Sequence, residues 1–115
     1  MPILTVLAVV PVADMDASVA WYEHLFDRPP DARAMPSLAD WHLTDTAWVQ
    51  VFHDPDRAGS TLFNLTVADL SAQLAELAER GISSGEIATT SKAGKLAALT
   101  DPDGNTITLI ENPAT

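Results

Sequence analysis

The sequence predicts an α+β fold built of two similar βαβββ modules. Three observations predict it. The segment Val12–Ala20 recurs in similar form as Val67–Ala75, and each copy follows an apolar run and begins a helical pattern. Apolar residues alternate within the runs, as in strands with one buried face. The chain of 115 residues is long enough to bury the core of one domain.

The first module, residues 3–55, is predicted to begin with a strand over Leu4–Val10. A helix follows, capped by Asp14 or Asp16, and ends before the proline pair at 29–30. The apolar stripe of this helix comprises Val19, Trp21 or Tyr22, Leu25 and Phe26. Three more strands are expected over Ala32–Met35, Trp41–Thr44 and Ala47–Phe52, with a turn at Asp45-Thr46.

The second module, residues 60–112, repeats this order after a linker at residues 55–60, within one domain of residues 1–115. Its first strand is expected over Leu62–Val67, and its helix begins at Asp69 or Ser71 and ends near Gly81. The helix stripe comprises Leu70, Leu74, Leu77 and Ala78. The later strands are expected over Ile87–Thr90, Leu96–Thr100 and Thr106–Glu111, with a turn at Asp103-Gly104.

The alternation gives the predicted strands two different faces. One face is apolar throughout and is expected to pack on the helices; its residues are Val6, Ala8, Val10, Val49, Val51, Phe63, Leu65, Val67, Ile107 and Leu109. The other face mixes polar and apolar side chains. Such a mixed face suits a concave surface that holds a ligand, a half-exposed sheet or a dimer contact.

Charge and composition exclude several classes of function. The net charge is −10, with 16 acidic and 6 basic residues, so nucleic acid and anionic membranes are not expected partners. This charge attracts a cationic small molecule or a basic protein, although scattered acids also simply keep a domain soluble. The sequence has no cysteine, which excludes disulfides and thiol chemistry and agrees with a cytoplasmic location. No apolar run is long enough to span a membrane.

Three segments, VVPVADMDASVAWYEHLF, TLFNLTVADLSAQLAELAERG and DPDGNTITLIE, resemble the vicinal oxygen chelate superfamily of glyoxalases, extradiol dioxygenases and bleomycin-resistance proteins. The resemblance extends from Leu4 to Glu111. It implies that the paired βαβββ modules form a curved mixed sheet around a pocket, with the helices on its outer face. Members that use a metal place four His or Glu ligands on inward-facing strand positions. These positions fall here on Leu7, Gln50, Leu62 and Thr108. None of the four is a good metal ligand, so we expect neither a metal nor another cofactor.

The tryptophans indicate a ligand surface. If the turn at Asp45-Thr46 has two residues, Trp41 pairs with Gln50 and both tryptophans, Trp41 and Trp48, lie on the mixed face. A shift of one residue would put His42 there in place of Trp41. Tryptophan rings bind flat or cationic ligands by stacking and cation–π contact, although they can equally fill a dimer interface or plug the pocket. The predicted ligand-binding residues are Trp41, Trp48, Gln50, Phe52, Leu7, Leu62, Asn64 and Thr108.

Other candidate sites are weaker. His24 is predicted to be a solvated helix residue and His53 a rim residue, while a metal pair of His42 and His53 with Asp40 or Asp54 is an alternative. The segment 101–105 resembles a calcium loop but lacks its ligand alternation, so it is interpreted as a turn. Glu111 lies close to the last ligand position, but its parity places it on the opposite face.

The sequence therefore favours a metal-free protein that binds an aromatic or cationic small molecule, such as an antibiotic, as bleomycin-resistance proteins do. The resemblance to that branch implies a homodimer. The first alternative is a glyoxalase-like or dioxygenase-like lyase or isomerase with a non-standard site. It would need a metal or an acid–base pair, and no catalytic residue is predicted. The second alternative is a small dimeric regulatory domain whose mixed face binds a protein.

Overall fold

The first half of the chain forms one four-stranded sheet, which we call the first sheet. The structure, a computed structural model, describes residues 1–90 and 94–112. Strand β1 pairs in parallel with β4, and the remaining neighbours are antiparallel. The strand order is β1-β4-β3-β2, with β1 over Val6–Val12, β2 over Ala32–Met35, β3 over Leu38–Thr44 and β4 over Ala47–His53.

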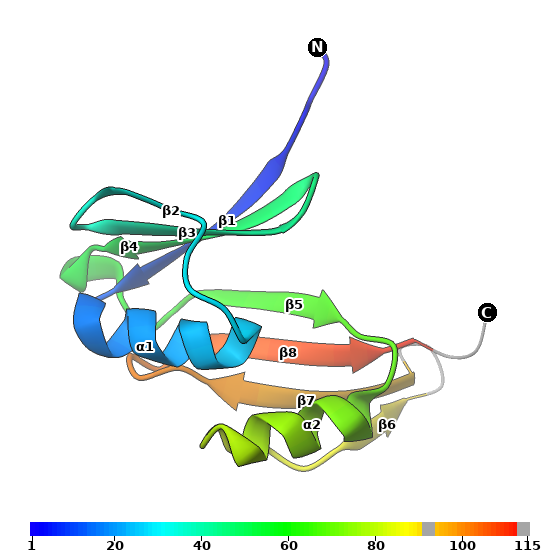
Figure 1. Ribbon diagram of the computed structural model, residues 1–115. Coiled ribbons are helices and arrows are strands. Elements are labelled where there is room, and N and C mark those ends of the chain that lie inside the picture. The colour runs from blue at the N-terminus through cyan, green and yellow to red at the C-terminus, as the bar shows by residue number, and fades with distance from the viewer. Residues whose placement is uncertain (91–93, 113–115) are drawn as a thin grey trace.

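The second half forms the second sheet with the same topology (Figure 1). Its order is β5-β8-β7-β6, and β5 pairs in parallel with β8. The bounds are Leu62–Thr66 for β5, Ala88–Thr90 for β6, Gly94–Thr100 for β7 and Thr106–Glu111 for β8. A short 3-10 helix, η1 (Pro55–Arg57), lies between the halves. The predicted α+β class with two mixed βαβββ units is confirmed.

Both helices begin at an aspartate N-cap. In α1 (Met15–Phe26) the carboxylate of Asp14 accepts from the backbone N–H of Ala17 at 3.1 Å. In α2 (Leu70–Glu79) Asp69 accepts from Ala72 at the same distance. These bonds satisfy amide groups that have no partner within the helix. Asp14 and Asp69, rather than the alternatives Asp16 and Ser71, are therefore the caps.

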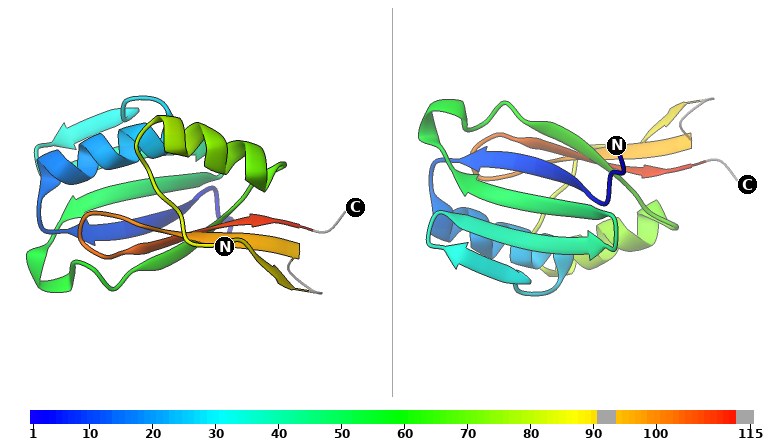
Figure 2. Two further views of the ribbon diagram at one scale, coloured as in Figure 1. Left: turned by 90° about the horizontal axis from the view of Figure 1, so that it is seen from below. Right: turned by 90° about the horizontal axis from the view of Figure 1, so that it is seen from above.

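The core lies between the two sheets. Figure 1 shows α1 below the first sheet, and Figure 2 shows α1 and α2 along one side of the molecule. Arg80, after α2, donates from Nε to the backbone oxygen of His24 on α1 at 2.6 Å. Neither helix of the described residues is long and apolar enough to cross a membrane. The buried apolar residues are Val10, Val12, Tyr22, Leu25, Ala39, Trp41, Val49, Val51, Leu70, Leu77, Ile82, Ala97, Leu99, Ile107 and Leu109.

Two residues of the predicted apolar faces, Val6 of β1 and Ala78 of α2, are exposed rather than buried. Strand β1 runs from Val6 to Val12 rather than from Leu4 to Val10, and its buried end is formed by Val10 and Val12. Val6 is 68% exposed because it lies at the open end of the sheet, paired with the exposed Ala47. The alternating apolar residues of β1 are therefore buried only at its covered end, at Val10 and Val12.

A buried carboxylate, that of Asp101, links the two halves. Its Oδ2 accepts from the hydroxyl of Tyr22 on α1 and from Nδ2 of Asn105, each at 2.8 Å. Its Oδ1 accepts from the backbone N–H groups of Asp103 and Asn105 at 2.9 Å. Burial, together with the neighbouring Asp101 charge, raises the pKa of Tyr22 far above its usual value, so the phenol stays protonated and donates.

Asn105 extends this network to β1 and to the linker. Its Nδ2 also donates to the backbone oxygen of Pro11 at 3.1 Å, and its Oδ1 accepts from the N–H groups of Gly59 and Thr61. Gly59 has φ +94°, and a Cβ there would lie 2.6 Å from the backbone oxygen of Asp103. Only glycine fits this close approach without strain. The turn after β7 therefore fixes α1, β1 and the linker together.

Asn105→Ala is expected to lower the free energy of unfolding by about 3 kcal/mol or more. The variant leaves several buried polar groups without partners, and each costs about 1–3 kcal/mol. Urea unfolding followed by circular dichroism measures the change. Asn64→Ala, at an exposed position of β5, is the matched control and is expected to change stability by less than about 1 kcal/mol. Equal losses in the two variants would contradict this role of Asn105.

Candidate functional site

The two sheets present their mixed faces outward, away from the core between them. We call these the outward faces. On the first sheet, side chains from three strands lie in rows, because Leu7 pairs with Trp48 and Val9 with Gln50. The neighbouring strand adds Asp40 beside Gln50 and His42 beside Trp48. Apolar side chains thus flank a polar and aromatic centre on this face; Leu7 is 39% and Val9 47% exposed.

Trp41 does not lie on the outward face, contrary to the prediction. The two-residue turn at Asp45-Thr46 is present, since Thr44 pairs with Ala47, but the register shifts between His42 and Thr44. This bulge makes Trp41 pair with Val49 and turns its ring into the core, where it is fully buried. Its indole N–H donates to the backbone oxygen of Arg28 at 3.0 Å. The tryptophan is a core residue and is inaccessible to a ligand.

His42 takes the place predicted for Trp41. Its ring stacks on that of Trp48, with 3.6 Å between ring centroids and 14° between ring planes. Gln50 and Phe52 lie on the same face of β4 as Trp48 and are half-buried. The first sheet therefore brings together Leu7, Trp48, Gln50 and Phe52 of the predicted set. The sequence alone does not determine which face His42 occupies. That face is set by the bulge between His42 and Thr44, which no pattern in the sequence predicts.

The backbone of His42 is held by a loop. Asp31 Oδ2 accepts from the N–H of His42 at 2.8 Å and from Arg28 Nη2 at 3.2 Å. Arg28 also donates to the backbone oxygen of His42. The hydrogen bond from His42 and the charge of Arg28 hold the pKa of Asp31 below its usual value of 3.8. These contacts fix the strand position from which the His42 ring projects.

The remaining predicted residues lie on the outward face of the second sheet. Leu62 pairs with Thr106 and Asn64 with Thr108, so all four side chains share one surface. Leu62 is 69% exposed and Asn64 is exposed. Since the core faces of both sheets point toward the helices, this surface and that of the first sheet look in different directions. The chain by itself therefore divides the predicted site into two separate halves.

The four positions where metal-using members of the resembled superfamily hold ligands do not suit a metal here. Leu7 and Gln50 lie on the first sheet, and Leu62 and Thr108 lie on the second. Leucine has no donor atom, and a neutral amide and hydroxyl bind hard cations only beside carboxylates. Glu111, close to Thr108, instead accepts from the N–H of Leu70 and caps α2. These four residues therefore do not form a site that could hold a metal ion for catalysis.

The alternative metal site, His42 and His53 with Asp40 or Asp54, is not formed by the described residues either. Nε2 of the exposed His53 lies 3.1 Å from the backbone oxygen of Ala13, and Nδ1 of His24 lies 2.9 Å from that of Arg80. Within residues 1–90 and 94–112, no group of three or more His, Asp or Glu side chains could hold a metal ion. The predicted rim position of His53 and surface position of His24 agree with their exposure.

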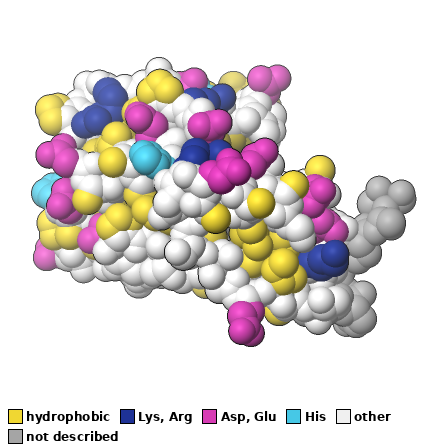
Figure 3. Space-filling model, turned by 60° about the horizontal axis from the view of Figure 1, so that its bottom comes forward, with side chains coloured by type: hydrophobic (Ala, Val, Ile, Leu, Met, Phe, Trp, Pro, Cys, Tyr) yellow, Lys and Arg dark blue, Asp and Glu magenta, His cyan; other side chains and the backbone are white. Residues whose placement is uncertain are grey.

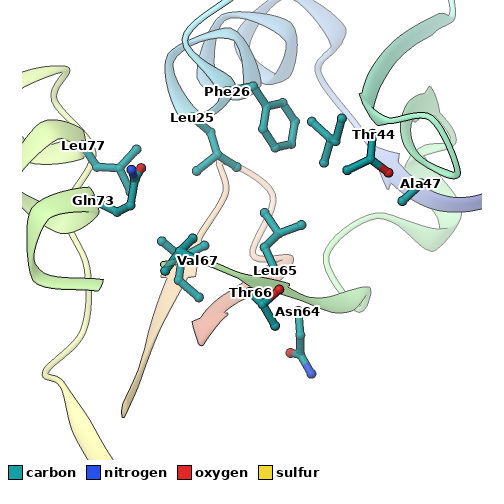
Figure 4. A pocket seen from close by; sticks show the side chains of 12 residues that line it. Leu25, Phe26, Thr44, Ala47, Asn64, Leu65, Thr66, Val67, Gln73 and Leu77 are labelled. Carbon is teal, nitrogen blue, oxygen red and sulfur yellow. The ribbon is translucent and has the colours of Figure 1, made fainter. Parts of the chain in front are cut away.

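A cavity of about 460 Å³ lies between the two halves on the core side (Figure 4). Figure 4 shows Leu65 pointing toward Phe26 and Leu25, whereas Asn64 points to the other side of β5. The lining residues are Leu25, Phe26, Leu43, Thr44, Ala47, Asn64, Leu65, Thr66, Val67, Gln73, Leu77 and Leu109. This hollow is mostly apolar and is distinct from the Trp48 surface.

Acidic side chains are scattered over the molecular surface rather than gathered in a block. Figure 3 shows one face on which they alternate with apolar, basic and other groups. The charge thus gives the whole molecule an attraction for cations without marking one site by itself.

A family model for the glyoxalase/bleomycin resistance protein/dioxygenase superfamily matches residues 4–109. The chain belongs to this superfamily. The predicted resemblance is thereby confirmed, and the superfamily fold agrees with the two βαβββ halves. The comparison with curated proteins gives no match.

Solved structures of this superfamily share the fold over nearly the whole chain. A glyoxalase/bleomycin resistance protein from Catenulispora acidiphila is 32% identical, with a TM-score of 0.89, over 96% of this chain and 99% of that one. A bleomycin-binding protein solved with bleomycin is 23% identical, with a TM-score of 0.77 and coverage of 95% and 98%. TnmS3, an antibiotic-binding protein from a Streptomyces species, is 23% identical, with a TM-score of 0.76 and 95% coverage of each chain.

Asp31→Asn is expected to remove a pH-dependent contribution to stability. A carboxyl whose pKa is lowered on folding stabilises the folded state above its unfolded pKa, and this contribution is lost as the pH falls through the folded pKa. The variant should therefore be less stable than the wild type at about pH 6, with a smaller difference at about pH 2.5. Urea unfolding at both pH values measures this. Asp45→Asn, in the exposed turn after β3, is the charge-matched control. A difference that stays constant with pH would contradict the prediction.

Proposed function

We propose that this member of the superfamily is a metal-free binding protein that sequesters a planar aromatic or cationic small molecule, such as an antibiotic. The observation that carries the proposal is the Trp48–His42 stack on the outward face of the first sheet, beside the exposed apolar residues Leu7 and Val9 of β1. Such a surface offers aromatic area to a flat ligand and a negative potential to a cation.

The binding site is proposed to be completed by a second copy of the chain. The outward face of the first sheet would be closed by that of the second sheet of the partner, and two-fold symmetry would produce two equal cups. Exposed large apolar side chains support this arrangement, since surfaces of this kind are common at interfaces. They include Leu7 and Val9 on one face, Leu62 on the other and Ile3 and Leu4 in the N-terminal segment.

Residue types at the metal positions support binding rather than metal-assisted catalysis. Leu7 and Leu62 would place apolar surface at the centre of each cup, and Gln50, Asn64 and Thr108 would orient a ligand by hydrogen bonds. We also propose a cytoplasmic location, supported by the cysteine-free sequence.

Planar aromatic cations are expected to quench the tryptophan fluorescence, and Trp48→Leu is expected to weaken their binding about five- to thirtyfold. The loss corresponds to the roughly 1–2 kcal/mol of a stacking or cation–π contact. Titration of a panel of charged and neutral planar compounds measures the affinities.

Two controls accompany this titration. Trp21→Phe, on α1, is expected to keep the wild-type affinity. Leu65→Phe, which fills the cavity between the halves, is also expected to keep it, because that cavity is separate from the Trp48 surface. Absence of quenching across the whole panel would contradict the proposed function. Loss of binding in Leu65→Phe alone would place the ligand in the cavity instead.

The protein is expected to sediment as a dimer, and Leu62→Asp is expected to produce monomers. A charge placed on the outward face of the second sheet would be buried without a partner in the dimer, yet it leaves the fold of one chain intact because Leu62 is exposed. Analytical ultracentrifugation distinguishes the 12.3 kDa chain from its dimer. Ala20→Asp, on the exposed side of α1, is the control and should remain dimeric. A monomeric wild type at tens of micromolar would exclude this assembly.

A further inference from the structure

Asp40 and His42 carry buried polar atoms that the described residues leave without a hydrogen bond. These atoms are Oδ1 of Asp40 and Nε2 of His42, and they are the two such atoms found in the described part of the chain. Asp40 is only 9% exposed. Buried polar groups almost always have a partner, so two adjacent exceptions require an explanation.

Both atoms belong to the same surface. Asp40 and His42 alternate along β3 with Ala39 and Trp41, which are fully buried in the core, so their side chains lie on the outward side of the strand. Two residues along a strand separate their Cα atoms by about 6.6 Å. Asp40 lies beside Gln50, and His42 stacks on Trp48. The unpaired atoms therefore border the aromatic surface of the proposed site.

Hydrogen bonds hold the backbone from which both side chains project. The backbone oxygen of Asp40 accepts from the N–H of Asp31 at 2.7 Å, and Arg28 and Asp31 hold both backbone groups of His42. The arginines do not neutralise Asp40, since the ion pairs among the described residues join Arg28 to Asp31, Arg57 to Asp54 and Arg80 to Asp27. A rigid acceptor without a cation of its own is suited to receive one from a ligand.

We infer that Asp40 and His42 anchor a flat N–H cation of the ligand, an amidinium or guanidinium group attached to an aromatic ring. One N–H would donate to Asp40 Oδ1 and a second to Nε2 of a neutral His42, because such groups present donors in one plane. The attached ring would lie on Trp48, which moves off the His42 ring as the ligand enters. This inference rests on the proposed function and narrows its ligand class.

The test compares 2-naphthamidine with its neutral isostere 2-naphthamide by isothermal titration calorimetry on the full chain. The wild type is expected to bind the amidine about tenfold or more tightly than the amide, as expected for a charge-assisted hydrogen bond. Asp40→Asn is expected to reduce this preference to less than about threefold while leaving the affinity for the amide unchanged. Asp45→Asn removes an exposed acid of the same hairpin and should keep the full preference.

A stability measurement separates a binding role from a structural one. If Asp40 serves a ligand, neutralising its unpaired carboxylate costs the free protein nothing, and the Tm of Asp40→Asn is expected to equal or exceed that of the wild type. A clear fall in Tm would indicate a structural role and overturn the inference.

The possible outcomes distinguish this inference from the proposed function. Equal wild-type affinities for the amidine and the amide would leave aromatic binding standing but overturn the anchor. If Asp40→Asn keeps the preference for the amidine, the anchor role of Asp40 is likewise overturned while aromatic binding stands. Failure of both compounds to bind would overturn the anchor together with the proposal of an aromatic ligand.

Discussion

The carboxylate of Asp101 is the contact on which the arrangement of the two halves depends. It joins Tyr22 of α1 to the turn before β8, and Asn105 joins the same turn to β1 and to the linker. All of these groups are buried or half-buried, so each hydrogen bond is costly to lose. A short turn thereby sets the position of the second sheet relative to the first helix.

This arrangement determines where a ligand can bind. The buried apolar residues of β1, β4, β7 and β8 face the core, and the alternate residues of β1 and β4 face outward. The Trp48 surface and the Leu62–Thr108 surface consequently belong to different sides of the chain. In the proposed dimer each of these surfaces would be one half of a site, and its chemistry would depend on the residues that project from it.

Much of this could be predicted from the sequence. The internal repeat, the Asp caps and the alternation of the strands indicated the order of the elements and the parity of the core, because these depend on local spacing. The face of Trp41 could not be predicted, since a bulge between His42 and Thr44 shifts the register by one residue. Asp40 was considered only as part of an alternative metal site, because its unpaired Oδ1 becomes visible only in the packing around it.

The placement of the two outward faces on different sides of the chain has a genetic consequence for the proposed dimer. In a symmetric pair of chains, each cup would take one wall from each copy. When both copies carry the same substitution in either wall, both cups would be damaged. A mixed assembly, with one copy altered at Trp48 and the other at Leu62, would contain one doubly damaged cup and one intact cup. Two inactive alleles could then complement each other when expressed together.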